Sequence, residues 1–158
     1  MQGEISGRIQ EHLANYLDKP HTIAELNAGA ANVGNLKPDD LQATEGYFWH
    51  QIQIFSSLRQ IYLGTKQGQF IGVERQDSGE LAAKITENFP RRSFYGLDAL
   101  GNRTKLLRFE PNYDLRDRPW YLRATAAEQP VWTEIYTFFR AIWESRRLGH
   151  FMLTLTAP

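Results

Sequence analysis

Charged and aromatic side chains are concentrated between residues 113 and 121, which read Tyr-Asp-Leu-Arg-Asp-Arg-Pro-Trp-Tyr. Pro119 favours the first turn of a helix, because that turn makes no use of the N–H that proline lacks. Arg118, just before it, carries a planar and permanently charged guanidinium that suits bidentate binding of a carboxylate. Trp120 and Tyr121 add flat apolar faces, each with one hydrogen-bonding atom. One cation combined with several aromatic rings indicates a pocket for a small carboxylate.

Two further tyrosines, one at the start of this segment and one in the apolar stretch that follows it, can add hydroxyl groups to the same pocket. The predicted ligand-binding residues are therefore Tyr113, Arg118, Trp120, Tyr121 and Tyr136. The alternative is structural. In that interpretation Arg118 pairs with Asp114 or Asp117, and Trp120 is a core residue at the start of a helix.

The same segment could also suggest a paired general acid and base at Asp114 and Asp117. The flanking arginines would instead hold both carboxylates ionised, which suits loop-stabilising ion pairs better than proton transfer. The chain has no cysteine, no glycine-rich phosphate loop and no nucleophile elbow. Its histidines show neither metal-ligand spacing nor a convincing axial haem ligand; they are His12, His21, His50 and His150. We expect no catalytic activity, no cofactor and no metal.

The composition fits a single globular domain and argues against nucleic acid as a partner. Of the 158 residues, 42% are hydrophobic, which is enough for one core. Lysine plus arginine and aspartate plus glutamate both number 18, so the formal net charge is zero. A nucleic-acid binder needs a basic excess for its phosphate contacts. No stretch of about 18 apolar residues is present, so we expect no membrane span within this sequence.

The first 37 residues have the pattern of one long helix. Apolar residues recur at steps of three and four and would line one face, namely Ile5, Ile9, Leu13, Tyr16 and Leu17, then Ile23, Leu26, Ala30 and Val33. Pro20 is expected to interrupt the backbone hydrogen bonds with a mild kink, and the capping-box spacing of Thr22 and Glu25 to restart the helix. At 1.5 Å per residue this unit would run roughly 45 Å, which is longer than a small domain needs to cover itself.

After Pro38 the pattern changes to a second helix and then to strands with period two, separated by glycine turns. The helix includes Leu41, Phe48, Ile52 and Phe55 on one side. The predicted strands are 58–65, 69–75, 81–87, 93–97 and 104–109, with turns at 66–68, 77–79 and 100–102. A short helix at about 119–127 and a strand at 131–138 follow. Consecutive strands preceded by long helices predict an α+β fold, with a long N-terminal helix packed on an antiparallel sheet.

The motif Asp114-x-Arg116-x-Arg118-Pro119-Trp120-Tyr121, followed by Trp132-x-x-x-Tyr136, resembles the signature of the double Cache family. The hairpin Tyr62-x-Gly64-x-x-x-Gly68 and the two preceding helices extend the resemblance over most of the chain. This family supplies extracytoplasmic sensor domains to bacterial chemoreceptors, histidine kinases and nucleotide cyclases. The resemblance implies a PAS-like sheet whose membrane-distal module, here residues 38–139, holds the ligand. It also implies a location on the periplasmic or extracellular face of the membrane.

By the same resemblance, Arg118 and Trp120 would hold a ligand carboxylate, with the two neighbouring tyrosines alongside. Amino-acid-binding members have an aspartate two residues after the position of Tyr136, and this chain has Phe138 there. An ammonium group without a counter-charge would be desolvated without compensation. A small organic acid, or another neutral or anionic ligand, is therefore the expected partner.

The resemblance also predicts how a signal would leave the domain. A ligand that binds two arrangements of the domain with different affinity would shift the long helix. The simplest assembly is a parallel homodimer packed along the face of Ile5, Ile9 and Leu13. The alternative is an interaction module that only dimerises and has a vestigial pocket.

Residues 140–158 do not fit this family, whose domains continue with a glycine, a strand resembling Leu-Gly-Ile-Thr and a second module. Another reading frame, from the third base of the Arg140 codon, permits Gly-Asp-Leu-Gly-Ile-Thr-Ala-Ser-Arg-Pro-Phe-Tyr. We therefore expect a frameshift near Arg140 and a non-native tail; a genuine but divergent strand at 151–156 is the alternative. The chain then divides into a helix (1–37), a module (38–139) and the tail (140–158). Because Met1-Gln2-Gly3 leads directly into the helical pattern without a signal peptide, we expect a fragment whose membrane anchors lie outside it.

Overall fold

The computed structural model describes residues 2–127 and 131, and for residues 2–5 and 12–17 it describes the backbone alone. The predicted strand at 131–138 extends beyond this part of the chain. Trp132, Tyr136, Phe138 and both interpretations of the tail at 140–158 also lie outside it. These predictions therefore stay predictions.

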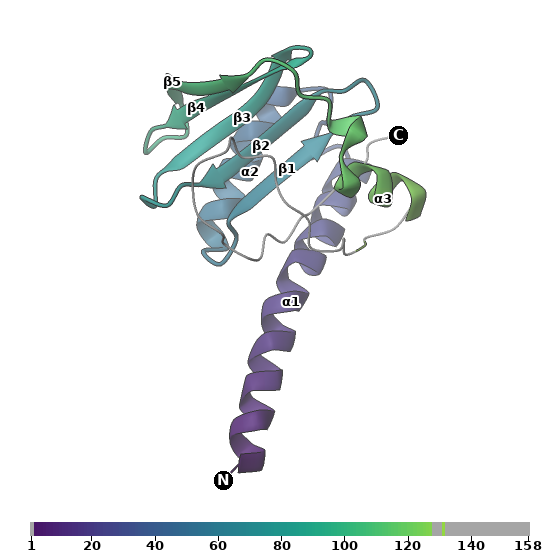
Figure 1. Ribbon diagram of the computed structural model, residues 1–158, viewed down its shortest axis with the longest axis vertical. Coiled ribbons are helices and arrows are strands. Elements are labelled where there is room, and N and C mark those ends of the chain that lie inside the picture. Colours follow the sequence, from purple (N-terminus) through teal and green to yellow (C-terminus); the bar gives the residue numbers. More distant parts are fainter. Residues whose placement is uncertain (1, 128–130, 132–158) are drawn as a thin grey trace.

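Two helices, five strands, a 3-10 turn and a third helix follow one another along the described chain (Figure 1). The helices are α1 (Gln2–Asn32), α2 (Leu41–Ile54) and α3 (Pro119–Ala127), with a 3-10 turn η1 (Leu115–Asp117) before α3. The strands are β1 (Gln60–Gly64), β2 (Phe70–Arg75), β3 (Leu81–Asn88), β4 (Arg91–Leu97) and β5 (Arg103–Glu110). The predicted α+β fold is confirmed, with small differences at the ends of the strands.

The strands form one antiparallel sheet in the sequential order β1-β2-β3-β4-β5. Three of the turns that join them contain a glycine with positive φ, namely Gly68 (85°), Gly79 (89°) and Gly101 (83°). Each of these glycines donates its N–H to the carbonyl oxygen three residues earlier, which closes the turn. A residue with a Cβ would be strained in this backbone conformation. The three turns lie where the sequence predicted them.

Successive side chains along each strand point to opposite sides of the sheet, so its two faces contact different parts of the domain. One face packs against α2 and holds the main hydrophobic core, whose members from α2, β1 and β2 are Phe48, Ile52, Ile61, Leu63, Ile71 and Val73. Tyr62 of β1 and Phe70 of β2 point the other way and belong to a separate aromatic cluster on the opposite face. Figure 1 shows α2 behind the sheet and α3 beside β1. The segment with the predicted site therefore packs on the face that α2 leaves uncovered.

α1 runs through Pro20 as one helix from Gln2 to Asn32, so the hydrogen bond that is missing at the proline does not end it. Thr22 lies inside this helix and donates from Oγ1 to the carbonyl oxygen of Asp18 (3.1 Å). It is therefore not an N-cap, and the predicted restart of the helix is wrong. Pro20 is buried, and Ile23 and Ala24 lie in the core beside α2. This packing offsets the hydrogen bond that proline removes from the helix.

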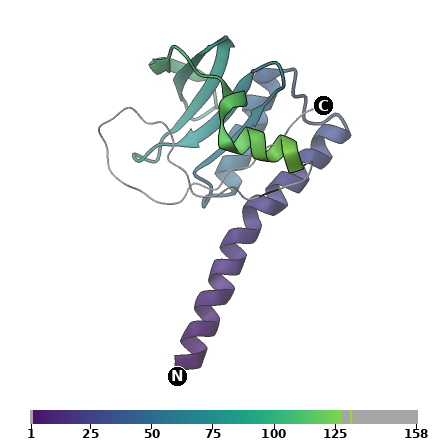
Figure 2. The ribbon, with the colours of Figure 1, turned by 45° about the vertical axis from the view of Figure 1, so that its right-hand side comes forward.

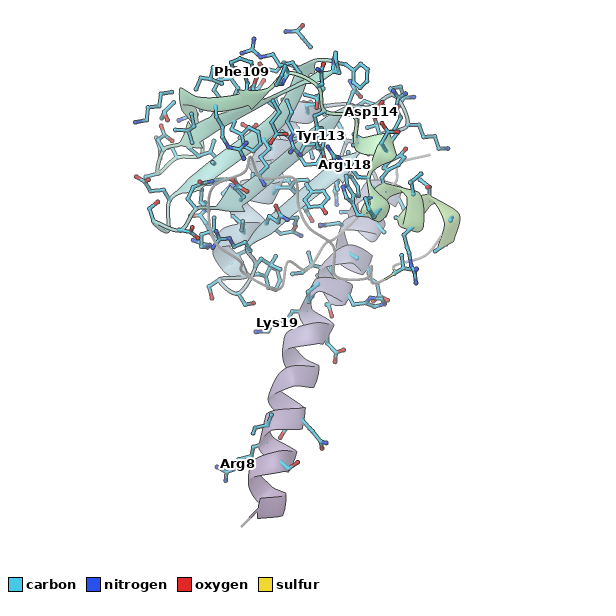
Figure 3. The ribbon with its side chains drawn as sticks, viewed as in Figure 1. Arg8, Lys19, Phe109, Tyr113, Asp114 and Arg118 are labelled. Carbon is cyan, nitrogen blue, oxygen red and sulfur yellow. The ribbon has the colours of Figure 1, made fainter. Side chains whose placement is uncertain are left out.

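The N-terminal half of α1 extends away from the rest of the domain (Figures 1 and 2). Lys19, labelled in Figure 3, lies near the place where the helix leaves the domain. Figure 2 shows the helix axis changing direction close to that level, as is common in a helix that contains proline. Ile9, on the extended half, is 55% exposed. Within the described residues, no helix is both long and apolar enough to cross a membrane.

Local caps end α1 and begin α2. Gly34 has a φ of 79°, and the N–H of Asn35 donates to the carbonyl oxygen of Ala30 (2.8 Å), which satisfies an acceptor at the end of α1. At the start of α2, the side chain of Asp40 accepts a hydrogen bond from the N–H of Ala43 (2.9 Å). These caps reverse the chain within a few residues, and α2 then packs on β1 and β2 in the same core as Ile23 of α1.

Candidate functional site

The predicted motif follows β5 as a compact turn and then a helix. Asp114 accepts hydrogen bonds from the backbone N–H of Arg116 (2.9 Å) and from its guanidinium (Nε, 2.9 Å; Nη2, 2.7 Å). These hydrogen bonds lower the pKa of Asp114, so the carboxylate stays ionised. Arg116 thus makes an ion pair with this aspartate. The N–H of Arg118 donates to the carbonyl oxygen of Leu115 (3.0 Å), and α3 begins at Pro119 as predicted.

An aromatic cluster joins this turn to β1 and β2. Its members are Tyr62, Phe70, Tyr113, Leu115, Trp120 and Tyr121. Trp120 is only 1% exposed, and its ring centroid lies 4.8 Å from that of Tyr62. Gly64 makes room for the indole, because a Cβ there would lie 2.9 Å from Cη2 of Trp120. Trp120 is therefore a core residue at the start of α3, as the structural alternative supposed, and it anchors α3 to the sheet.

Tyr113 is the ring on which two cations converge. Cζ of Arg92 lies 3.3 Å from its centroid, and Cζ of Arg118 lies 5.0 Å from it. Nε of Arg118 is buried, and Figure 3 shows this side chain close to Tyr113 beside the sheet. Arg118 therefore points into the domain. Burial raises the pKa of Tyr113, although the two guanidiniums oppose that shift, so the hydroxyl is protonated at neutral pH.

Arg92 connects this ring to the open face of the sheet. It is buried, and it donates to Oε2 of Glu110 from Nε (3.1 Å) and from Nη2 (2.6 Å). Its Cζ lies 5.1 Å from the ring of Phe70 and 5.2 Å from the ring of Phe94. Arg108 binds the other oxygen of the same glutamate through Nη1 (2.9 Å). Cations and aromatic rings thus alternate along this face, and each ring stabilises the charges over it.

Tyr121 belongs to the same cluster. It is buried, and its ring centroid lies 5.6 Å from that of Trp120. Burial raises its pKa, and the charges that act on it are those of the ion pair at η1. The structure thus brings together Tyr113, Arg118, Trp120 and Tyr121. Tyr136 lies outside the described residues.

Sequence reasoning missed Arg92, and with it Lys84 and Arg108. The predicted strand began at Ser93, which left Arg92 in a turn, whereas β4 begins at Arg91. A signal was present, because Arg92 and Phe94 are two residues apart in one strand and must point to the same face. Lys84 likewise interrupts an apolar strand at a position that faces away from the core.

Comparison of the chain with protein-family models, with curated proteins and with solved structures gives no match. In the part of the chain that the structure describes, no group of three or more histidine, aspartate or glutamate side chains could hold a metal ion.

Proposed function

We propose that this domain binds a small anion, most simply a carboxylate, as the extracytoplasmic sensing part of a transmembrane receptor of the double Cache type. The observation that supports this proposal is the convergence of two guanidiniums, those of Arg92 and Arg118, on the ring of Tyr113. Like charges held close together repel each other, and an anion bound beside them relieves that repulsion. The role requires binding alone and no reacting group.

A carboxylate suits this arrangement better than a cation or an ammonium-bearing ligand. Its two oxygens match the fork of a guanidinium, and charge-assisted hydrogen bonds of this kind are among the stronger ones in proteins. The Tyr113 hydroxyl, protonated at neutral pH, can donate a hydrogen bond and adds no negative charge.

The sheet supplies a route from this site to α1. Tyr62 and Phe70 belong to the cluster at the site. Their neighbours in the two strands, Ile61 and Ile71, point to the opposite face and lie in the core. Ile23 of α1 lies in that same core. A ligand with different affinities for two arrangements of the sheet would therefore shift α1. In a full-length receptor the shift would pass to a kinase, a cyclase or a chemotaxis output.

A thermal-shift titration with acetate, propionate and lactate tests the proposal. A carboxylate at a hundred times its dissociation constant should stabilise the domain by about 2.7 kcal/mol. Arg118→Ala should abolish this shift while circular dichroism shows an unchanged fold. Arg123→Ala, which removes an exposed arginine from α3, is the matched control and should keep the shift. The proposal is overturned if the wild type shows no shift, or if Arg118→Ala responds as the wild type does.

An interaction module is the second candidate, and exposed apolar residues on α1 favour it. Ile9, Leu26 and Val33 are all more than half exposed along this helix. A parallel homodimer would bury such residues. Analytical ultracentrifugation should then show a dimer, and Ile9→Glu should dissociate it. Gln10→Glu, which introduces the same charge at the next residue, is the control and should leave the dimer intact. A dimer that shows no thermal response to any carboxylate would favour this second candidate over the first.

A further inference from the structure

A second group of cations surrounds Phe94, away from Arg118. Relative to the Phe94 ring centroid, Nζ of Lys84 lies at 5.7 Å, Cζ of Arg92 at 5.2 Å and Cζ of Arg108 at 3.4 Å. Strand register explains the convergence, because Lys84 on β3 pairs with Phe94 on β4, and Phe94 pairs with Arg108 on β5. Three separate strands thus bring positive charge to one ring on the face that α2 leaves uncovered.

The carboxylates of this group do not balance its positive charge. Glu74 pairs with Lys84, and Glu110 is shared by Arg92 and Arg108. Three basic and two acidic side chains leave an excess of one positive charge. The side chains of Lys84 and Arg92 are 9% and 7% exposed, so water screens this excess poorly, whereas the side chain of Arg108 is 47% exposed. The cluster is therefore approached from the side of Arg108.

A buried hydroxyl lies on the same face. Thr86 is two residues beyond Lys84 on β3, and the intervening Ile85 lies in the core on the opposite face. Thr86 is 4% exposed, and its Oγ1 makes no hydrogen bond to any described residue. A buried hydroxyl without a partner is costly, and an anion is the partner to which a hydroxyl donates most strongly. This observation is independent of the charge excess and points to the same kind of ligand.

From these observations we infer that Lys84, Arg92 and Arg108 form a second anion-binding subsite, and that the ligand of this domain is a small dicarboxylate. One carboxylate would bind at Arg118 and Tyr113, and the other at the cluster around Phe94. Arg92 joins the two ends, because it lies over the rings of both Tyr113 and Phe94. This inference rests on the proposed function, and it adds the ligand class.

Isothermal titration calorimetry with succinate and propionate tests the second subsite. These acids differ in one carboxylate, so their affinity ratio measures what the second carboxylate contributes. We expect the wild type to bind succinate about tenfold or more tightly than propionate, because a charge-assisted hydrogen bond is worth that much. Arg108→Ala should bring this ratio close to one. Lys105→Ala, which removes an exposed cation from the same strand, should leave the ratio as in the wild type.

The outcomes separate the two proposals. If the wild type binds both acids with equal affinity, the second subsite is overturned and the proposed function stands. If it binds neither acid, the proposed function fails and the dicarboxylate inference fails with it. If succinate is preferred but Arg108→Ala keeps that preference, the second carboxylate binds elsewhere and the subsite is overturned. Thr86→Val, which replaces a buried hydroxyl by a methyl group of similar size, should lower the ratio as well.

Discussion

Asn27 and Gln51 exchange two hydrogen bonds in the buried contact between α1 and α2. Nδ2 of Asn27 donates to Oε1 of Gln51 (3.0 Å), and Nε2 of Gln51 donates to Oδ1 of Asn27 (2.6 Å). Asn27 is fully buried, so each amide depends on the other for these bonds. The pair fixes the position of α1 along α2, because a shift by one residue would separate both amides.

Asn27→Leu should therefore destabilise the domain by about 1–3 kcal/mol, because it leaves the amide of Gln51 buried with unmade hydrogen bonds. The double variant Asn27→Leu/Gln51→Leu should recover much of that loss, since neither buried amide remains. Urea denaturation of the two single variants, the double variant and the wild type measures the coupling. Strictly additive losses would show that the two amides do not depend on each other.

Substitution by alanine should have opposite effects on stability at two glycines. At Gly72 a Cβ would lie 2.6 Å from Cβ of Tyr62 and 3.0 Å from the carbonyl oxygen of Ile61, so Gly72→Ala should displace the neighbouring strand β1 and destabilise the domain by about 1–3 kcal/mol. At Gly46, inside α2, a Cβ would meet nothing within 4 Å. Gly46→Ala should stabilise the domain by about 0.5–1 kcal/mol, because alanine loses less conformational entropy in a helix. Thermal unfolding of both variants checks the two signs, and a stable Gly72→Ala would contradict the close approach of Tyr62.

Arg103 of β5 attaches the sheet to α2 through a buried carboxylate. Its Nε lies 3.0 Å from both oxygens of Glu45, whose side chain is 7% exposed. Arg103→Ala should cost about 3 kcal/mol of the free energy of unfolding, because Glu45 then stays buried without its partner. The exposed pair of Arg59 and Asp77 supplies the control, and Arg59→Ala should cost less than about 1 kcal/mol. Equal losses in chemical denaturation would show that burial of Glu45 is unimportant.

The pair of Glu74 and Lys84 makes stability depend on pH. Burial alone would raise the pKa of Glu74, but the charge and hydrogen bond of Lys84 lower it below its usual value. The unfolded chain therefore binds this proton at higher pH than the folded one. The stabilisation is present above the unfolded-state pKa and is lost as the pH falls through the folded-state pKa.

Glu74→Gln should accordingly be less stable than the wild type at about pH 7, and the difference should shrink as the pH falls toward about 3. Denaturation curves at several pH values measure this trend. Glu80→Gln, in the exposed turn between β2 and β3, is the control and should differ little from the wild type throughout. A difference between Glu74→Gln and the wild type that does not change with pH would contradict the argument.

The elements of the fold were predictable because local signals agree with the tertiary structure. Gly68, Gly79 and Gly101 sit at turns that need positive φ, and period-two alternation fills the strands between them. The start of α3 followed from Pro119 for a similarly local reason. Pro20 shows the limit of such signals. Packing of Ile23 against α2 decides that α1 continues, and this contact is invisible in the sequence around the proline.

The candidate site was predictable only in part. Tyr113, Arg118 and Trp120 are close in sequence and share one turn, so their proximity followed from the motif. The charges at Phe94 come from three strands, and only the register of the sheet brings Lys84 and Arg108 to the same ring. A one-residue slip in that register would have sent these cations to the other face. Their convergence could therefore be found only in the structure.

Under the proposed function, the extended half of α1 would act as a lever arm. At about 1.5 Å per residue, the part before Pro20 is roughly 27 Å long, so a tilt of about five degrees at the pivot moves its tip by about 2 Å. A rearrangement at the sheet that is too small to alter its hydrogen bonds would thus become measurable at the far end of the helix. A test of the proposed function should therefore place its probes of motion near Arg8, and not near Arg118.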